Sequence, residues 1–522
     1  MTRYMPLAAP LVGLVIALGI VAIEVGREGG EPEAVASFAE GTLTPSAGSG
    51  AGAPPAATVD PLARDIQFAS DGRHWARGMQ APSTSNGPPK MAIADDGSII
   101  VGMTVSYFEA PPGAYQVDVG GGPATGGGSW DGLIAKYDDS GALLWSRLFA
   151  SNGDEGIGDV ALTGGGAILV SGTYGDGADL GRGPEPAADE RDIFLARYRS
   201  DGTLDWLHTY GGIGRDGGGQ LGLFDNGDIA WSGSFEGSGN VGDFPVEAAV
   251  PYPGFIARLS PAGDPRWVTP VAGRGVFTLN HAAGLVVFGY NNGSPPTPPE
   301  DLEFGVGALS YDGSTVWRHP FSGTGHASVA DIEALPDGSS FVVGRFSEPT
   351  DFGDGITEPA GCCHKYTNEN MVSDAFALRV ASTGSLMWSK HWGGNLLDDA
   401  SSVTIEAGGT ALVGGTLYST FDVQGLDDAL PAVSAAGSWM PEPEGKAYVA
   451  RFTLDGEASE LMYVDEAGRV DRIGPIFVDS AATEDGEMLV GGRYFFTVTF
   501  PFGGRIANPD WLDYFIARIE AP

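Results

Sequence analysis

Positive charge is scarce in this chain. Of its 522 residues, 28 are lysine or arginine and 67 are aspartate or glutamate, which gives a formal net charge of −39. Such a charge repels phosphate backbones and anionic lipid head groups. The composition therefore argues against nucleic acid as a partner, and it limits any membrane contact to a separate segment of the chain.

Cysteine is almost absent, because the only two are the neighbours Cys362 and Cys363. Adjacent cysteines cannot form a disulfide framework, and they do not supply spaced pairs of metal ligands. Three states stay open for them: a vicinal disulfide, unpaired thiols, and a metal or redox site. The chain also lacks the G-x-S-x-G and H-E-x-x-H motifs, a phosphate-binding loop and a D-x-D-x-D-G calcium loop. We therefore predict no catalytic residue and no cofactor-binding residue.

Long hydrophobic runs are limited to one, at the start of the chain. Residues 4–23 carry no charge, and the fully apolar part is residues 11–23. That length lies between a signal-peptide core and a short transmembrane helix. Residues 1–23 are thus either a cleaved signal peptide or a membrane anchor formed by residues 5–23, and no cysteine follows that would make a lipoprotein. Both interpretations predict export to the periplasm, the cell surface or the medium.

The next segment, residues 24–60, is rich in glycine, alanine, proline and serine. Such a composition buries too little apolar surface to fold, so we predict a disordered linker. The composition changes at about residue 61, where the repeat region begins. We therefore assign residues 61–522 to a single folded domain.

Glycine is abundant in that domain, with 82 in the whole chain, and it accompanies a repeat. One element of the repeat is a strand of the form apolar-apolar-Ala-basic-apolar, such as "FLARY" and "FIARL". A turn that ends in glycine follows, and a tryptophan comes four residues after the glycine. A second hairpin, such as "DNGDIAWSG", completes the unit, and its Asn-Gly or Asp-Gly pair is a strong hairpin signal. Seven copies of this hairpin predict seven units of four strands each.

Each unit has two hydrophobic faces that it cannot bury alone, so neighbouring units must stack. Radial stacking of four-stranded units gives a β-propeller, which leaves few open edges. The last unit ends at "DYFIARIEAP" without a tryptophan strand, whereas "DGRHWARGM" near the start supplies one with no unit of its own. We therefore expect residues of about 73–79 to complete the last blade, so that strands from both ends of the chain close the ring.

The phrases "DIFLARYRSDGTLDW", "GDIAWSGSF" and "KAYVARFTLDG" resemble the bacterial seven-bladed β-propeller repeats of the SBBP type. They resemble, more loosely, the tryptophan-docking blades of quinoprotein-like propellers. The resemblance covers roughly residues 65–520. It implies an all-β, seven-bladed fold and implies almost nothing about function.

Two sets of repeat residues are structural candidates. The basic residue of the repeated strand is expected to form an ion pair between blades or to pack on a neighbouring tryptophan, with a ring of anion-binding side chains as the alternative. Its copies are Lys136, Arg197, Arg258, Arg379, Arg451 and Arg518. The tryptophans of the repeat are Trp75, Trp145, Trp206, Trp267, Trp317 and Trp388.

Three recurrent carboxylates are further candidate metal ligands. Glu155, Asp216 and Asp398 each precede the hairpin glycine of their blade by eleven residues, which places them where the inner strand begins, near one mouth of the central channel. They could coordinate calcium there, or they could cap backbone N–H groups. Both interpretations stay open, and apart from calcium no cofactor is expected.

Long loops are the candidate binding surface. The segments 104–131, 174–191, 235–252, 346–373 and 417–445 are expected to join equivalent strands of successive blades and to crowd onto one face, where binding residues usually lie. They carry the aromatic residues Tyr107, Phe108, Tyr115, Tyr418 and Trp439, which either contact a partner or pack within their own loops.

Three functions stay open on this basis. The leading hypothesis is a non-catalytic, exported and monomeric propeller that binds a protein or glycan partner at the cell envelope. The alternative is a propeller hydrolase, lyase, lactonase or lectin with a divalent metal at the channel mouth. A structural subunit of an envelope complex is the third hypothesis, and nothing in the sequence separates it from the first.

Overall fold

A computed structural model describes residues 68–520 of the chain, apart from fifteen short gaps. The gaps are residues 81–87, 107–114, 188–189, 213, 248–252, 274, 292–303, 324–326, 360–372, 395–397, 407, 418–445, 465–478, 483–486 and 500–504. The predicted signal or anchor, the predicted linker and the cysteine pair all lie outside the described residues. No helix in the described part of the chain is long and apolar enough to cross a membrane.

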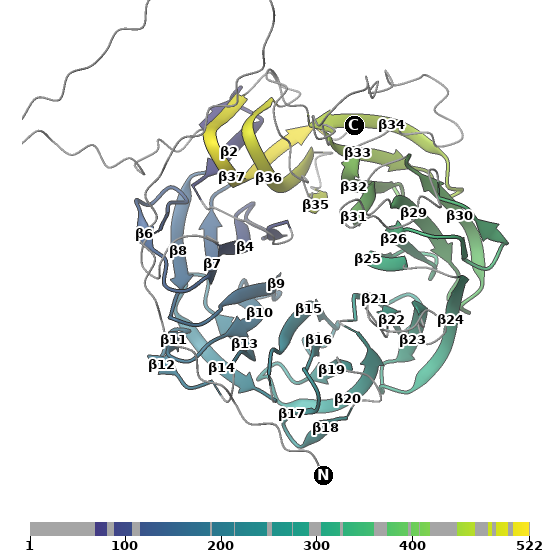
Figure 1. Cartoon of the computed structure of the whole chain (residues 1–522), viewed down its shortest axis with the longest axis horizontal. Coiled ribbons are helices and arrows are strands. Elements are labelled where there is room, and N and C mark those ends of the chain that lie inside the picture. The colour runs from purple at the N-terminus through teal and green to yellow at the C-terminus, as the bar shows by residue number, and fades with distance from the viewer. Residues whose placement is uncertain are drawn as a thin grey trace, which may run out of the picture. The chain divides into compact units, whose positions relative to one another are not determined.

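Seven antiparallel blades form a ring (Figure 1). Blade 1 consists of β3 (Lys90–Ile93), β4 (Ile99–Ser106), β7 (Trp130–Tyr137) and β8 (Leu143–Phe149). Blade 2 consists of β9 (Gly156–Leu162), β10 (Ile168–Tyr174), β13 (Asp192–Tyr198) and β14 (Leu204–Tyr210). Blade 3 consists of β15 (Gly217–Leu223), β16 (Ile229–Ser234), β19 (Pro253–Leu259) and β20 (Pro265–Ala272).

Blades 4 to 6 repeat this arrangement. Blade 4 consists of β21 (Phe277–Asn280), β22 (Leu285–Asn291), β23 (Phe304–Ser310) and β24 (Thr315–Gly323). Blade 5 consists of β25 (Ala327–Ala334), β26 (Ser340–Phe346), β29 (Asp374–Val380) and β30 (Leu386–Trp392). Blade 6 consists of β31 (Asp399–Ile405), β32 (Ala411–Leu417), β33 (Lys446–Phe452) and β34 (Ala458–Val464). Blade 4 has a short inner strand, β21, of four residues.

The seventh blade closes the ring with strands from both ends of the folded region. Its strands are β35 (Asp479–Ala482), β36 (Glu487–Thr499), β37 (Arg505–Glu520) and β2 (Trp75–Met79), and β1 (Phe68–Ser70) adds a fifth strand at the outer edge. In the register of β2 and β37, Trp75 lies opposite Arg518. The prediction that residues 73–79 complete the last blade is therefore confirmed.

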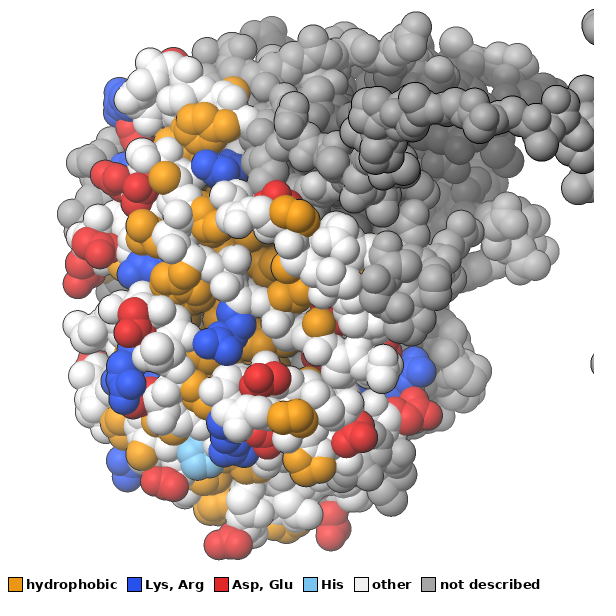
Figure 2. All heavy atoms as spheres, turned by 90° about the vertical axis from the view of Figure 1, so that its left-hand side faces the viewer, with side chains coloured by type: hydrophobic (Ala, Val, Ile, Leu, Met, Phe, Trp, Pro, Cys, Tyr) orange, Lys and Arg blue, Asp and Glu red, His pale blue; other side chains and the backbone are white. Residues whose placement is uncertain are grey.

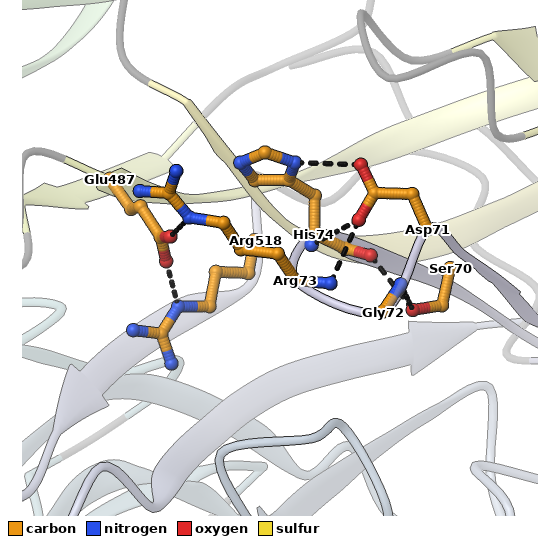
Figure 3. Close-up of polar contacts among 7 residues, drawn as sticks. All are labelled: Ser70, Asp71, Gly72, Arg73, His74, Glu487 and Arg518. Carbon is orange, nitrogen blue, oxygen red and sulfur yellow. Dashed lines mark hydrogen bonds and ion pairs between the residues drawn. The ribbon is translucent and has the colours of Figure 1, made fainter.

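A charged cluster fixes the hairpin that brings β2 into the ring (Figure 3). The Arg73 Nε donates to Glu487 Oε1 at 2.6 Å, and Arg518 pairs with the other oxygen of the same carboxylate. Within the hairpin turn, the Asp71 carboxylate accepts the backbone N–H groups of Arg73 and His74 at 2.9 and 2.7 Å. Residues from the two ends of the folded region thus meet at one buried carboxylate.

The hydrophobic core lies between neighbouring blades. One cluster joins Leu489 and Ile516 of blade 7 to Val101 and Ala135 of blade 1, and the other blade contacts are built in the same way. The second strand of a blade is covered on both sides, so all residues of β10 are buried. Outer strands such as β8 alternate between exposed and half-buried residues. Each pair of blades thus has its own core, which accounts for a ring of this size.

The two rims of the ring differ. We call the side that carries the connections between second and third strands, and the connections between blades, the loop face. We call the side that carries the two kinds of tight hairpin turn the turn face. Each long loop joins the second and third strands of a single blade, because β10 pairs directly with β13 and β16 with β19. The expectation that these loops join equivalent strands of successive blades is therefore wrong.

Candidate functional site

The three candidate metal ligands lie at the loop face, one in each of three connections between blades. The backbone N–H of Glu155 donates to the Trp130 carbonyl at 2.9 Å, and Asp216 does the same with the Arg191 carbonyl at 2.9 Å. Asp398 donates to the Ser373 carbonyl at 2.7 Å. In every case the acceptor lies where a third strand of the preceding blade begins. The three residues therefore occupy equivalent places in blades 2, 3 and 6.

Glu155 is 1% exposed, and its side chain accepts hydrogen bonds from the protein itself. The Ser151 N–H and hydroxyl donate to it at 2.8 and 2.6 Å, and the Gly175 N–H donates at 3.1 Å. Gly175 is the first residue after β10, so one carboxylate holds both the connection between blades and the start of a long loop.

The same contacts recur in blades 3 and 6. The Asp216 carboxylate accepts the Gly212 N–H at 2.8 Å and the Glu236 N–H at 3.0 Å. The Asp398 carboxylate accepts the Gly394 N–H at 2.8 Å. In all three blades, the N–H four residues before the carboxylate is a donor. The side chains therefore cap backbone groups, as the structural interpretation of these residues expects.

A second buried carboxylate lies 24 residues before each of the three: Asp131, Asp192 and Asp374. These aspartates are 0%, 3% and 0% exposed. Asp131 accepts the Gly127 and Gly128 N–H groups at 2.8 and 3.2 Å, together with the Tyr115 hydroxyl. Our sequence reasoning missed these residues. The signal that would have found them is an aspartate five residues before the repeated basic residue in "DGLIAK", "DIFLAR" and "DAFALR".

Burial changes the protonation of these groups. Burial, together with the nearby Asp131 charge and against the hydrogen bonds from Ser151 and Gly175, raises the pKa of Glu155 to about 7. Burial also raises the pKa of Asp131 above its usual range, against the opposing effect of its hydrogen bonds. Burial, together with the Asp192 charge, raises the pKa of Asp216 to about 6. Near neutral pH, a fraction of the Glu155 and Asp216 side chains is therefore protonated.

The described residues contain no group of three or more His, Cys, Asp or Glu side chains that could hold a metal ion. The structure does not bring Glu155, Asp216 and Asp398 together, since each serves a separate blade. Their hydrogen bonds identify them as backbone caps. Calcium coordination was the alternative interpretation of these residues, and the calcium measurement described in the Discussion tests it.

The repeated tryptophans each reach the following blade. The Trp317 ring lies against Gly384, where an added Cβ would come within 2.6 Å of Trp317 Cδ2, and its indole N–H donates to the Ser382 carbonyl at 2.8 Å. Equivalent bonds run from Trp75 to Asp139 at 2.9 Å, Trp145 to Ser200 at 3.1 Å, Trp267 to Tyr311 at 3.0 Å and Trp388 to Leu454 at 2.9 Å. Trp206 differs, because its indole N–H is buried without a hydrogen-bond partner.

The repeated basic residues connect blades in a way that we did not expect. Arg258 Nε pairs with Asp228 of its own blade at 2.8 Å, while its Nη1 donates to the Tyr311 carbonyl of the next blade at 2.9 Å. Arg379 pairs with Asp337 of its own blade and donates to the Leu454 carbonyl at 2.7 Å. The ion pair thus lies within a blade, and a hydrogen bond to a carbonyl links the blades.

The other basic residues vary around this arrangement. Arg451 pairs with Glu406 and Glu460 at 2.9 and 2.5 Å, Arg518 pairs with Glu487, and Lys136 is 8% exposed. Arg197 lies 3.8 Å from Asp205 and donates to the Pro261 carbonyl at 3.5 Å. The five arginines of this set bind protein groups, so they are committed to contacts within and between the blades.

Four long loops contain a small hairpin that packs on the outside of the ring. These rim hairpins are β5–β6 (Gln116–Val117 and Ala124–Thr125), β11–β12 (Ala178–Asp179 and Pro184–Glu185), β17–β18 (Gly239–Val241 and Phe244–Val246) and β27–β28 (Thr350–Asp351 and Ile356–Thr357). β27 pairs with β24, the outer strand of blade 4. The rim hairpins therefore bridge the outer strands of neighbouring blades.

Three rim hairpins share the sequence Asp-apolar-Gly-x-Gly. In blade 2, Asp179 accepts the Gly181 and Gly183 N–H groups at 2.8 and 2.9 Å, while Leu180 is fully buried. In blade 5, Asp351 accepts the Gly353 and Gly355 N–H groups in the same way. The turn thus presents an apolar residue to the crevice between two blades.

This packing uses much of the described loop sequence. Tyr115 is 3% exposed and belongs to a blade core, so it packs within its own part of the fold. The other loop aromatics, Tyr107, Phe108, Tyr418 and Trp439, lie outside the described residues. On the side of the ring that contains blades 1 and 2, acidic, basic and hydrophobic side chains are interspersed (Figure 2).

Comparisons with known proteins give only distant structural likenesses. No protein-family model matches the chain, and no curated protein matches it. Puromycin hydrolase is similar at 14% identity, with a TM-score of 0.37, over 80% of this chain and 59% of that one. A Dyadobacter fermentans protein of unknown function is similar at 11% identity, with a TM-score of 0.38, over 70% of this chain and 93% of that one.

Citrobacter koseri AztD is similar at 13% identity, with a TM-score of 0.28, over 75% of this chain and 96% of that one. At such identities and TM-scores, these likenesses say nothing about what this chain binds. The matched region spans about three fifths of the puromycin hydrolase chain. The fold is that of a seven-bladed β-propeller, while the resemblance to SBBP repeats stays a prediction.

Proposed function

We propose that this chain is an exported, non-catalytic propeller that binds a protein or glycan partner through its loop face. The observation that carries the proposal is the common placement of the longest connections. Second strands run in the same direction in every blade, so every connection to a third strand leaves from one face. The largest intervals between paired strands run from Leu417 to Lys446 and from Phe346 to Asp374, and both belong to this face.

The rigidity of the roots of these loops supports the proposal. Buried carboxylates hold the residues at which several loops begin, as Glu155 holds Gly175. Binding loops gain affinity when a rigid scaffold fixes their ends, because less conformational entropy is lost on binding. Export and a monomeric state are part of the same proposal, and they rest on the N-terminal apolar run and on the strong net negative charge.

No specific observation among residues 68–520, with their gaps, favours the enzyme alternative. The carboxylates that suggested a channel-mouth metal accept hydrogen bonds from backbone N–H groups in each blade. We therefore retain one proposed function. A lectin is one form of that function, with a glycan as the partner.

The test replaces residues 419–444 with a short Gly/Ser linker and measures binding to a glycan array and to proteins of the producing cell's envelope. A matched control carries serine at Gly164 and Gly165, which lie in a hairpin turn on the turn face with open space around them. We expect the loop variant to lose at least ten-fold in affinity while its unfolding midpoint stays unchanged. The control should bind as the unaltered protein does.

Two results would contradict the proposal. One is binding that survives the loop replacement and is lost in the turn-face control. The other is turnover of a hydrolase or lyase substrate that Glu155→Gln abolishes.

A further inference from the structure

Three contacts between blades each contain two buried carboxyl groups at the same sequence separation. At the contact between blades 1 and 2, Asp131 is the second residue of the third strand of one blade, and Glu155 precedes the inner strand of the next. The Glu155 N–H binds the carbonyl of Trp130, the residue before Asp131, and the two carboxyl side chains are 1% and 0% exposed. Two ionised carboxylates buried at one contact repel each other, so a proton on one of the two is favoured.

These pairs connect the long loops of neighbouring blades. Asp131 accepts the N–H groups of Gly127 and Gly128, which end the loop of blade 1. Glu155 accepts the Gly175 N–H, which begins the loop of blade 2. A single carboxyl pair therefore lies between the end of one loop and the start of the next. At the second contact, Asp216 likewise accepts the Glu236 N–H at the start of the blade 3 loop.

The surroundings of each pair favour a bound proton to different degrees. The Asp131–Glu155 pair faces the hydroxyl groups of Tyr115 and Ser151. At the second pair, the positive charge of Arg191 opposes the proton on Asp216, and Arg191 Nε donates to the Asp216 carbonyl at 3.1 Å.

Arg215, next to Asp216 in the sequence, is paired with Glu190 at 2.7 Å, and its backbone N–H donates to the Glu236 carboxylate. At the third contact, burial and the Asp398 charge raise the pKa of the neighbouring Asp399, whereas the positive charge of Arg345 lowers it. Among the described contacts, the first pair therefore has the weakest compensation by positive charge, and the tests concentrate on it.

We propose that the carboxyl pairs at the first two of these contacts hold protons that fix the roots of the binding loops, so that the loop face is ordered in mildly acidic surroundings and loosens as the pH rises. The regulatory meaning rests on the proposed function, in which the loops are the binding surface. The proton binding does not rest on it, since it concerns the fold alone.

The sign follows from the direction of the shifts. Burial raises the pKa of Glu155 in the folded protein to about 7, above that of a free glutamate. Such a group stabilises the fold fully below its unfolded pKa, and that contribution is lost as the pH rises through the folded pKa. Near pH 8 the pair therefore favours opening, and near pH 5 it favours the closed state.

The experiment measures hydrogen-exchange protection factors of the Ser151 and Gly175 amides in the full chain at pH 5 and pH 8. For a pKa that falls from about 7 to about 4.5 on opening, linkage gives an opening constant that is on the order of 10- to 100-fold larger at pH 8. The variant Glu155→Gln keeps a carbonyl that accepts the amides and an amide group that donates to Asp131. We expect it to abolish most of this dependence and to protect both amides at pH 8.

The matched control is Asp351→Asn, at an exposed carboxylate that also accepts two backbone N–H groups. Its hydrogen bonds from Gly353 and Gly355 lower the pKa of Asp351, so that contribution is present above the unfolded pKa and is lost as the pH falls. The Gly353 and Gly355 amides of the unaltered protein should therefore not lose protection between pH 5 and pH 8.

Three outcomes would overturn the inference. The first is equal protection of Ser151 and Gly175 at the two pH values in the unaltered protein, a measurement that needs no variant. The second is a Glu155→Gln variant that keeps the full pH dependence, and Asp216→Asn provides the same test at the second pair. The third is protection at pH 8 that millimolar calcium restores, which would mean that the pairs hold a cation. Each can occur whether or not the loop replacement affects binding.

Discussion

Gly384→Ala tests the contact between the repeated tryptophan and the next blade. Gly384 has a φ of +87°, and an added Cβ would lie 2.6 Å from Trp317 Cδ2 and 2.8 Å from Cε3. A left-handed backbone costs an alanine about 1–2 kcal/mol. Overpacking against a ring that cannot move away adds about 1–3 kcal/mol. The free energy of unfolding should therefore fall by about 2–5 kcal/mol.

The control separates the two contributions. Gly166 has a φ of +74°, and an added Cβ there meets nothing within 4 Å. Gly166→Ala should therefore cost only the backbone contribution, about 1–2 kcal/mol. The difference of about 1–3 kcal/mol between the two variants measures the tryptophan contact.

The assay is unfolding in guanidinium chloride followed by far-UV circular dichroism, with the slope compared between variants so that only changes in midpoint are interpreted. A second background tests the mechanism directly. In a Trp317→Leu protein, Gly384→Ala should cost no more than Gly166→Ala, because the ring is no longer present. Equal costs of the two glycine substitutions in the unaltered protein, or an undiminished cost in the Trp317→Leu background, would refute the reasoning.

Further predictions concern the charged groups. Arg258→Met removes one partner of Asp228, which is 2% exposed, and should lower the free energy of unfolding by about 3 kcal/mol in chemical unfolding. Arg266 is a half-exposed partner of the same carboxylate, so Arg266→Met should cost under about 1 kcal/mol. Equal losses in the two variants would contradict this. Arg73→Ala should change the stability by under about 1 kcal/mol, because the arginine is 60% exposed, and a larger loss would make the N-terminal hairpin essential for ring closure. The thermal midpoint should be the same in EDTA and in millimolar calcium, whereas calcium at a hundred times its dissociation constant would add about 2.7 kcal/mol if the carboxylates bound it.

The number of blades could be predicted from the sequence because each blade carries the same local sequence signals. The Asp-Gly and Asn-Gly hairpins, the apolar alternation and the glycine–tryptophan spacing all act over a few residues. Ring closure was also predictable, since the last unit lacks a tryptophan strand and one such strand near the start has no unit of its own. The structure confirms that Trp75 completes the last blade.

Contacts across blades were harder to predict. The arginine repeat suggested an ion pair between blades, but Arg258 pairs within its blade and reaches across only to a carbonyl. A backbone carbonyl leaves no mark in the sequence, so no spacing rule reveals it. The rim hairpins were likewise hidden, because Asp-apolar-Gly-x-Gly reads as an ordinary turn until the neighbouring blade is in place.

The candidate site shows the same limit. The recurrence of Glu155, Asp216 and Asp398 was visible, and so was the capping interpretation, but their buried partners Asp131 and Asp192 were not identified. Each pair spans two blades, and burial together with the charge of the partner carboxylate raises the pKa of Glu155 and Asp216.

The sequence by itself thus determined the all-β class, the seven four-stranded units and the strands that close the ring, since local turn chemistry and hydrophobic period specify each unit. Only the tertiary structure decided which groups meet between the units. That includes the turn that each tryptophan packs against, the carbonyls that the arginines bind and the pairing of the buried carboxyls. The reason is physical: these contacts join residues of different blades, and their geometry depends on the angle and register at which two independently specified sheets pack.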